Sequence, residues 1–284
     1  MKKFFVVLIV FCFILVGCSN SSNKSNEKTV KMGEMLNSGE KVSFVVNSEE
    51  GIDKDSTVWY YVYTKDGKVT VYNSDLGVKL GEVSKLSDKD LIKRMKKEDK
   101  DYFEYSKSEK SKTWKNFIET AGDDQDDQKV IRGANKSLDA LDKLSYKKPK
   151  TMDLKVKVIT DGSGNNTEKE KVNVSINNIL IEDGDRASLD SLAKGFEYKY
   201  TNNTSSDNDG EDYFNTYDTV YGPIEVYDSK FVSLNSDEDD SALVTKVGEK
   251  TTAIEFDDKN DENVSETEEW WYFDIYSVRM RMVY

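Results

Sequence analysis

The chain has 284 residues, of which 33% are charged and 37% hydrophobic, and its formal net charge at neutral pH is −13. It contains no histidine, which excludes Ser-His-Asp and Cys-His nucleophiles, His-ligated zinc and HExxH metalloproteases. Aromatic residues make up 11% of the chain, too many for a wholly disordered acidic polypeptide. The acidic balance, without a visible basic face, also argues against nucleic acid as a partner.

The N-terminus has the parts of a secretory signal peptide. Lys2 and Lys3 form a short cationic segment, and residues 4–16 form an unbroken apolar run. As a helix this run would be about 20 Å long, short of the roughly 30 Å hydrocarbon core of a bilayer. We therefore predict a cleaved signal peptide over residues 1–17 rather than a transmembrane helix.

The apolar run ends in Leu15-Val16-Gly17-Cys18, which resembles the lipobox of bacterial lipoproteins. In that family the signal is cut before the cysteine, and the cysteine sulfur carries a diacylglyceryl group. The resemblance implies that Cys18 carries the lipid, with fatty acids such as palmitate. It places the protein on the extracytoplasmic face of the cell membrane, with residues 18–40 as lipidated cysteine and flexible tether. An ordinary secretory signal with an accidental cysteine is the alternative.

The composition after the signal also bears on the source of the chain. Lysine and asparagine dominate over arginine, which favours an AT-rich genome and, together with the lipobox, a Gram-positive organism. Removal of Lys2 and Lys3 would change the formal net charge from −13 to −15. Close electrostatic docking on an anionic bilayer is then unfavourable, so the lipid must provide the attachment.

Residues 41–146 are predicted to form an α+β domain. Apolar and polar residues alternate over residues 42–46, as in a half-buried strand. The runs 57–64 and 68–72 are rich in β-branched and aromatic residues and are separated by a turn with an Asp-Gly pair. Because glycine supplies the positive φ that such a turn needs, the pattern predicts a β-hairpin.

Three short helices are predicted after the hairpin. Ser87 and Asp90 resemble a capping box, and apolar residues then recur at helical spacing over residues 91–103. Further apolar stripes at helical spacing occupy residues 114–121 and 131–141. We interpret the three stripes as core-facing, because three short helices do not sustain the heptads of a coiled coil.

Residues 147–284 are predicted to form a β-rich domain that begins at a Lys-Lys-Pro-Lys segment. Short strands separated by Gly, Asn and Asp turns indicate mainly antiparallel structure, a sandwich or a partly open barrel. One short helix is expected to end at Gly195. The expected strands are residues 154–160, 171–176, 224–227, 231–234, 243–247, 252–256 and 270–283. The predicted fold class is therefore α+β, with an N-terminal hairpin and helices before the β-rich part.

The acidic clusters raise the question of calcium. They lie at residues 123–127, 237–240 and 257–262. The best local Ca²⁺ candidate is the pair Asp207 and Asp209, in a stretch that matches the first half of an EF-hand loop. The match fails at the position of the bidentate glutamate, which is Thr216. We favour solvated loops and no cofactor, and keep a Ca²⁺-dependent adhesion module as an alternative.

Two aromatic runs, residues 59–63 and 270–273, can provide stacking surfaces for sugars or for a partner protein. Because alternate residues of a strand face opposite sides, we expect half of each run to belong to a core. Overall we favour a core role for these aromatic residues over a role in ligand contact. If one face of the last strand is exposed, Trp270, Tyr272 and Tyr276 are the expected ligand contacts.

No catalytic signature stands out in the sequence. There is no GxSxG motif and no Walker-type phosphate loop, and no pair among the 54 acidic residues is singled out. We therefore predict a non-catalytic binding or interaction protein of the cell envelope, with an envelope protein or a polysaccharide as partner. A cell-wall glycoside hydrolase that uses only carboxylates is the second alternative, because that chemistry needs no histidine.

Overall fold

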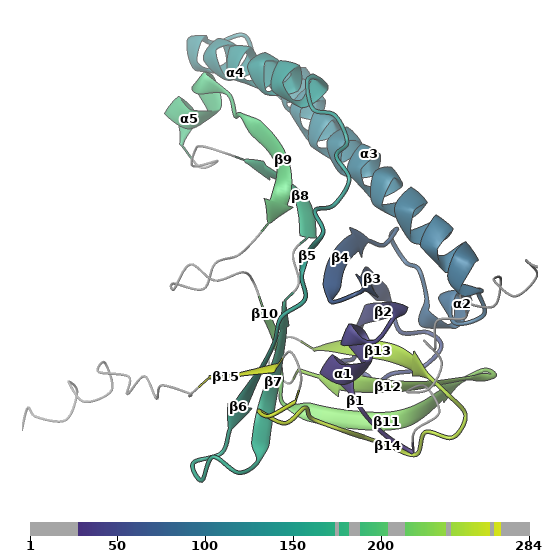
Figure 1. Ribbon diagram of the computed structural model, residues 1–284. Helices are drawn as coiled ribbons and strands as arrows, with labels where there is room; N and C mark the ends of the chain where they lie inside the picture. Colours follow the sequence, from purple (N-terminus) through teal and green to yellow (C-terminus); the bar gives the residue numbers. More distant parts are fainter. Residues whose placement is uncertain are drawn as a thin grey trace, which may run out of the picture.

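The computed structural model describes residues 28–173, 176–181, 188–203, 214–236, 240–261 and 264–267. These residues form an α+β structure with five helices and fifteen strands, in sheets that do not close into a barrel (Figure 1). The predicted fold class, with its largely β-structured C-terminal part, is confirmed. None of the described helices combines the length and the apolar character that crossing a lipid bilayer requires.

A seven-stranded sheet with the order β11-β12-β13-β2-β3-β4-β5 is the largest element of the fold. Its strands are β2 (Glu40–Asn47), β3 (Val58–Lys65), β4 (Lys68–Asn73), β5 (Met152–Asp153), β11 (Thr219–Val226), β12 (Ser229–Asn235) and β13 (Ser241–Val247). All neighbouring strands in it are antiparallel. The predicted β3–β4 hairpin is confirmed, and Asp66 and Gly67 in its turn have φ values of 50° and 69°.

The sheet takes strands from both sides of the Lys-Lys-Pro-Lys segment at residues 147–150. β13 pairs with β2, so strands from the two predicted domains are neighbours at its centre. β5, which directly follows the segment, pairs with β4. The predicted domain boundary therefore does not coincide with a break in the sheet.

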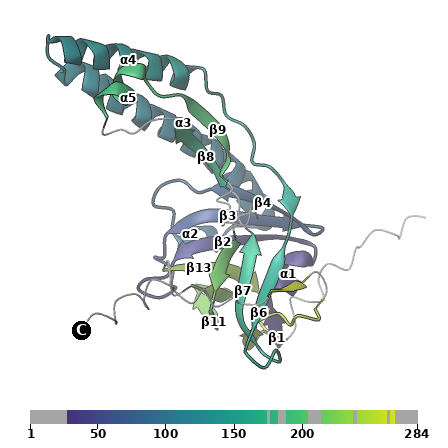
Figure 2. The same ribbon diagram turned by 90° about the vertical axis from the view of Figure 1, so that its left-hand side faces the viewer.

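A four-stranded sheet with the order β10-β7-β6-β15 runs across the seven-stranded sheet (Figure 2). It contains β6 (Val156–Thr160), β7 (Thr167–Asn173), β10 (Phe214–Tyr217) and β15 (Val264–Thr267). Two pairs are parallel: β15 with β6, and the separate pair of β1 (Thr29–Lys31) with β14 (Ala253–Glu255). Each joins segments far apart in the sequence, which supplies the long connection that parallel pairing requires.

Both faces of the seven-stranded sheet are covered. One face packs against α1 (Met32–Asn37) and the four-stranded sheet, and the other against α2 (Leu80–Val83) and the start of α3 (Asp88–Thr120). The aromatic run at residues 59–63 divides between the two faces, with Trp59 and Tyr60 against the first core and Tyr61 buried in the second. This run therefore belongs to the core, as favoured from the sequence.

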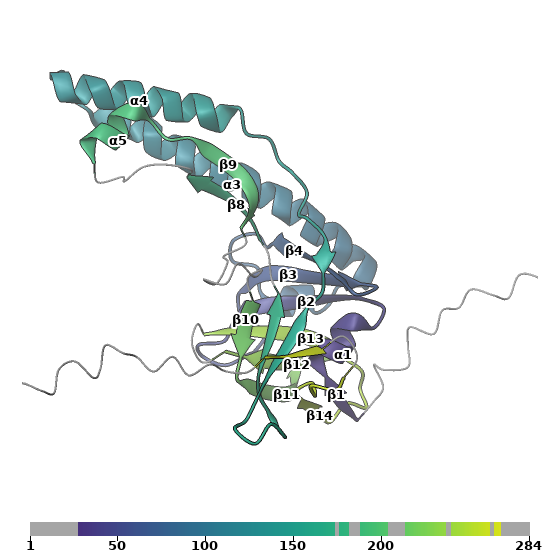
Figure 3. The same ribbon diagram turned by 60° about the vertical axis from the view of Figure 1, so that its left-hand side comes forward.

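A helical extension projects from the sheets (Figures 1 and 3). We call the C-terminal half of α3, together with α4, α5, β8 and β9, the arm, and the rest of the described chain the body. These elements are α4 (Gln125–Asp142), α5 (Leu189–Lys194), β8 (Ile176–Ile181) and β9 (Tyr198–Asn203). The core of the arm consists of Trp114, Ala134, Leu141, Phe196 and Tyr198. At about 1.5 Å per residue, α3 is about 50 Å long.

The prediction of three short helices is wrong. The first two stripes lie on the single 33-residue α3, because the helix continues through polar residues as it leaves the body and reaches the core of the arm. Its predicted N-cap is confirmed, since the Ser87 side chain accepts a hydrogen bond from the Asp90 N–H. Asp124 caps α4 in the same way, so the acidic cluster at residues 123–127 helps to start a helix.

In the C-terminal part, the predicted strand at residues 171–176 starts earlier than expected. β7 covers Thr167–Asn173, because its polar first residues pair with β6 across the turn at residues 161–166. α5 ends before Gly195 as predicted, and Gly195 has a φ of 79°. β6 lies within the expected strand at residues 154–160, and β11 to β14 overlap the expected strands between residues 224 and 256. The expected strand at residues 270–283 lies outside the described residues.

Candidate functional site

The sequence-predicted site residues all lie outside the part of the chain that the structure describes. They are Cys18, Asp207, Asp209, Trp270, Tyr272 and Tyr276. Their roles in lipidation, calcium binding and ligand contact therefore stay predictions. Among the described residues, no group of three or more cysteine or acidic side chains is placed to hold a metal ion.

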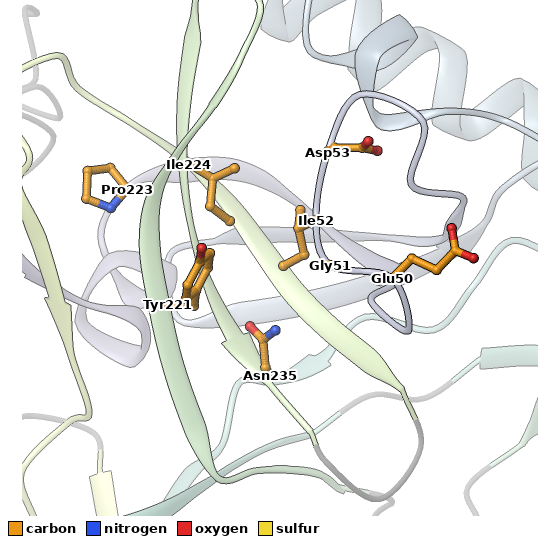
Figure 4. A pocket seen from close by; sticks show the side chains of 8 residues that line it. All are labelled: Glu50, Gly51, Ile52, Asp53, Tyr221, Pro223, Ile224 and Asn235. Carbon is orange, nitrogen blue, oxygen red and sulfur yellow. The ribbon is translucent and has the colours of Figure 1, made fainter.

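The structure instead shows a pocket of about 390 Å³ between the loop that follows β2 and the strands β11 and β12 (Figure 4). Its volume lies in the range of small-molecule sites. The lining residues are Glu50, Gly51, Ile52, Asp53, Tyr221, Pro223, Ile224 and Asn235. They come from two segments about 170 residues apart, which the pairing of β13 with β2 brings together.

Backbone hydrogen bonds fix the loop on one side of the pocket. The Ser48 N–H donates to the Asp240 carbonyl at 2.8 Å, which ties the loop to the turn between β12 and β13. The Gly51 N–H donates back to the Ser48 carbonyl at 2.8 Å, and the Asp53 N–H donates to Ser56 Oγ at 2.9 Å. The loop is thus a turn with its own hydrogen bonds. From it Ile52 points toward Tyr221 and Ile224, and the carboxylates of Glu50 and Asp53 lie on the other side of Ile52 from Tyr221 (Figure 4).

A bulge in β11 shapes the other side of the pocket. The register with β12 shifts between Tyr221 and Ile224, so that Gly222 and Pro223 do not pair. Gly222 has a φ of 137°, and a Cβ atom there would lie 3.0 Å from the Val232 Cα, so only glycine fits. The bulge leaves the Tyr221 side chain 60% exposed, whereas Ile224 packs against the core.

The polar groups are not evenly distributed around the pocket. The exposed carboxylates of Glu50 and Asp53 lie on the loop side, and Pro223 lies on the opposite side (Figure 4). Asn235, on β12, accepts a hydrogen bond from Ser233 Oγ at 2.6 Å through its side-chain oxygen. None of the eight lining residues is basic. The pocket therefore combines an exposed ring, aliphatic walls and negative charge.

A second group of carboxyls is buried in the body. Glu170 and Asp257 are fully buried, and the Asp257 N–H donates to Glu170 Oε2 at 2.9 Å. The Asp257 carboxylate accepts hydrogen bonds from the N–H groups of Gly33 (2.6 Å) and Glu34 (3.0 Å) in α1. Burial, and then the charge of Asp257, raises the pKa of Glu170 well above its usual range, and burial also raises the pKa of Asp257.

Neither of these carboxyl pairs has the arrangement that glycoside hydrolysis needs. That reaction uses two carboxyls on opposite sides of the scissile bond, with access for substrate and water. Glu170 and Asp257 are both inaccessible to solvent, and Glu50 and Asp53 come from one loop on the same side of the pocket. Neither pair therefore supports the hydrolase alternative, which stays a prediction.

Sequence reasoning missed the pocket and the buried pair, although local signals exist for both. Tyr221 directly precedes Gly222-Pro223, a dipeptide that interrupts a strand ladder and can leave the preceding ring exposed. Ile52 stands alone among acidic residues in a loop, which indicates that it packs against another element. Glu170 is two residues before Val172, so strand alternation places both on the inner face of β7.

Comparison of the chain with protein-family models and with curated proteins, and of its structure with solved structures, found no match. Function must therefore be inferred from the chain itself. The two features that bear on it are the N-terminal motif around Cys18 and the pocket between the β2–β3 loop and β11.

Proposed function

We propose that this protein is a lipid-anchored binding protein on the extracytoplasmic face of the cell membrane, and that it binds its ligand without catalysing a reaction. The observation that carries the proposal is the motif Leu15-Val16-Gly17-Cys18 after a cationic segment and an apolar run. Two acyl chains on Cys18, at about 0.8 kcal/mol per buried CH₂, suffice for durable anchoring, whereas a single chain does not.

The start of the described chain is compatible with an anchor at Cys18. Lys28 follows Cys18 by ten residues, and a chain of this length spans at most about 36 Å. β1 begins directly afterwards and lies at the end of the body away from the arm (Figures 1 and 3). Under the proposal, the β1 side of the body stays within about 36 Å of the bilayer, and the arm extends from the opposite end.

The pocket supports binding as the activity. Ligand sites are concave and largely apolar, with a few polar groups that orient the ligand. Here Ile52, Pro223 and Ile224 supply apolar walls, and Tyr221 supplies an exposed ring. The accessible carboxylates lie together on one side, so they suit recognition of a ligand better than attack on a bond.

Metabolic labelling tests the anchor. In the organism's own cells, we expect a radioactive fatty acid to label the wild-type protein in the membrane fraction. The variant Cys18→Ala should be unlabelled, and either released from the membrane or left with its signal uncut. Cys12→Ala is the matched control, because residue 12 lies in the predicted signal and its loss should leave the label unchanged. Equal labelling of Cys18→Ala and wild type would contradict the proposal.

A further inference from the structure

We propose that the pocket between the β2–β3 loop and β11 binds a cationic side chain, the guanidinium or ammonium group of an arginine or lysine in a peptide outside the cell. This inference rests on the proposed binding function and adds the chemistry of the ligand. It is carried by the exposed Tyr221 ring, by the apolar walls of the pocket and by the two carboxylates Glu50 and Asp53.

The shape and polarity of the pocket match a long cationic side chain. Arginine and lysine have hydrocarbon stems that pack on apolar surface while the charged end stays hydrated. Ile52, Pro223 and Ile224 provide such a surface. The face of an exposed tyrosine ring attracts a cation through its quadrupole, and Tyr221 is the most exposed aromatic side chain among the described residues.

The protein already makes this kind of contact nearby. Tyr227, just beyond the end of β11, has the Lys85 ammonium group 3.7 Å from its ring centroid. Tyr227 is 53% exposed, so the contact forms at a surface similar to that around Tyr221. Tyr227 thus shows that an exposed ring at the end of β11 can receive a cation, which is the contact proposed for Tyr221.

Charge favours a cation over other ligands. Glu50 and Asp53 line the pocket, and Glu49 of the same loop is also exposed, whereas Asp55 forms an ion pair with Lys54. The chain as a whole has a formal net charge of −13, which attracts basic peptides and repels anions. A neutral sugar could also stack on Tyr221 and donate hydroxyl hydrogen bonds to the two carboxylates, but its affinity would change little when salt is added. Charge dependence therefore separates the two kinds of ligand.

The test is a titration of the full mature protein in nonionic detergent with two short peptides. One is acetyl-Leu-Arg-Leu-amide, and in the other citrulline, a neutral isostere, replaces the arginine. We expect calorimetry at low ionic strength to show binding of the arginine peptide at least about fivefold tighter than that of the citrulline peptide. The ratio should decrease as salt is added, because the carboxylates are exposed.

Matched variants test whether the preference for the arginine peptide depends on the pocket. The double variant Glu50→Gln with Asp53→Asn should bring the two peptides closer in affinity, because only the attraction of the cation to the Tyr221 ring then distinguishes them. The control Glu225→Gln with Asp228→Asn changes the net charge by the same amount at exposed positions that do not line the pocket, and it should keep the preference. Tyr221→Ala should weaken binding of both peptides, whereas Tyr221→Phe should retain it.

Three results would overturn the inference. They are equal affinity of wild type for the two peptides, loss of the preference in the control double variant to the same extent as in the pocket variant, and absence of binding of either peptide at millimolar concentration. None of them affects the fatty-acid labelling of Cys18. The failure of the cation site is therefore distinguishable from the failure of the lipid anchor.

Discussion

The body and the arm are stabilised to different extents. In the body, the seven-stranded sheet is covered on both faces, and each face has its own large cluster of buried apolar residues. The arm has one cluster of five buried residues, and α5 buries none of its side chains. Because local stability follows buried apolar contact, the arm is the region that can open while the body stays folded.

Buried polar groups hold the first half of α3 on the seven-stranded sheet. Tyr61 of the sheet donates to Glu98 at 2.7 Å, and the Asn73 N–H donates to Asp99 at 2.8 Å. Tyr146, in the segment that follows α4, donates to the other oxygen of Asp99 at 2.8 Å. Glu98 and Asp99 are consecutive residues of α3, so these bonds fix the direction in which the helix leaves the sheet. The first half of α3 is thus tied to the body by these hydrogen bonds, whereas the far end of the arm has a small core.

The largest expected effect comes from removing one buried phenylalanine in each region. Phe231 in the body is 0% exposed and Phe196 in the arm is 2% exposed, so the two form a matched pair. Phe231→Ala should lower the free energy of global unfolding by about 3–5 kcal/mol. Phe196→Ala should destabilise the arm by a similar amount and leave the stability of the body unchanged. Hydrogen exchange should then show loss of protection in α4 and α5 with β2 and β3 still protected.

The comparison between body and arm would be wrong if Phe196→Ala reduced protection of β2 and β3 as strongly as that of α4. Such a result would mean that the arm and the sheet unfold as one cooperative unit.

A smaller effect is expected where α5 contacts α4. A Cβ atom on Gly133 of α4 would lie 1.8 Å from the Leu192 carbonyl oxygen, and backbone cannot move aside cheaply. Gly133→Ala should therefore separate α5 from α4 at a cost of about 1–3 kcal/mol, confined to the arm. The exposed neighbour Asn135 provides the control, since Asn135→Ala should leave α5 protected from hydrogen exchange. Unchanged protection of α5 in Gly133→Ala would show that the close contact is not required.

The smallest effect concerns the body and depends on pH. Because burial raises the pKa of Glu170 in the folded state, the folded protein binds this proton more tightly than the unfolded chain does. The contribution of protonated Glu170 to the free energy of unfolding is therefore present below the usual glutamate pKa of 4.5, and it is lost as the pH rises through the raised pKa. Gln at this position has no proton to lose. The unfolding free energy of Glu170→Gln minus that of wild type should therefore increase from pH 5 to pH 8.

Urea unfolding at the two pH values measures this difference. Glu168→Gln on the same strand is the control, because residue 168 is exposed and its replacement should leave the pH profile of wild type unchanged. Parallel pH profiles of Glu170→Gln and wild type would contradict the assignment of a raised pKa to Glu170.

The sequence predicted local structure better than it predicted contacts between distant segments. The Asp66-Gly67 turn, the Ser87 cap and the end of α5 at Gly195 each depend on neighbouring residues, and all three were predicted. The continuous α3 was missed because its middle turns are polar, and apolar periodicity disappears where a helix leaves one core before reaching another. These turns have a polar contact with the end of α4, where the Lys107 ammonium group donates to the carbonyls of Asp142 and Leu144.

The pocket was not predictable because its two walls come together only through the pairing of distant strands. Ile52 of the β2–β3 loop and Ile224 of β11 line the same pocket only because of a strand order that no local pattern fixes. The burial of Glu170 was predictable in part, since alternation with Val172 gives its face but not the presence of Asp257 beside it. The lipid anchor differs from the pocket, because a short contiguous motif in the sequence predicts it. Cys18 itself lies outside the described residues.

Mass spectrometry of the protein extracted from its native membrane tests the central claim most directly. The account predicts a chain whose first residue is Cys18, with the added mass of a diacylglyceryl group on that residue. A native chain that retains residues 1–17, or one whose Cys18 sulfur carries no lipid, would contradict it.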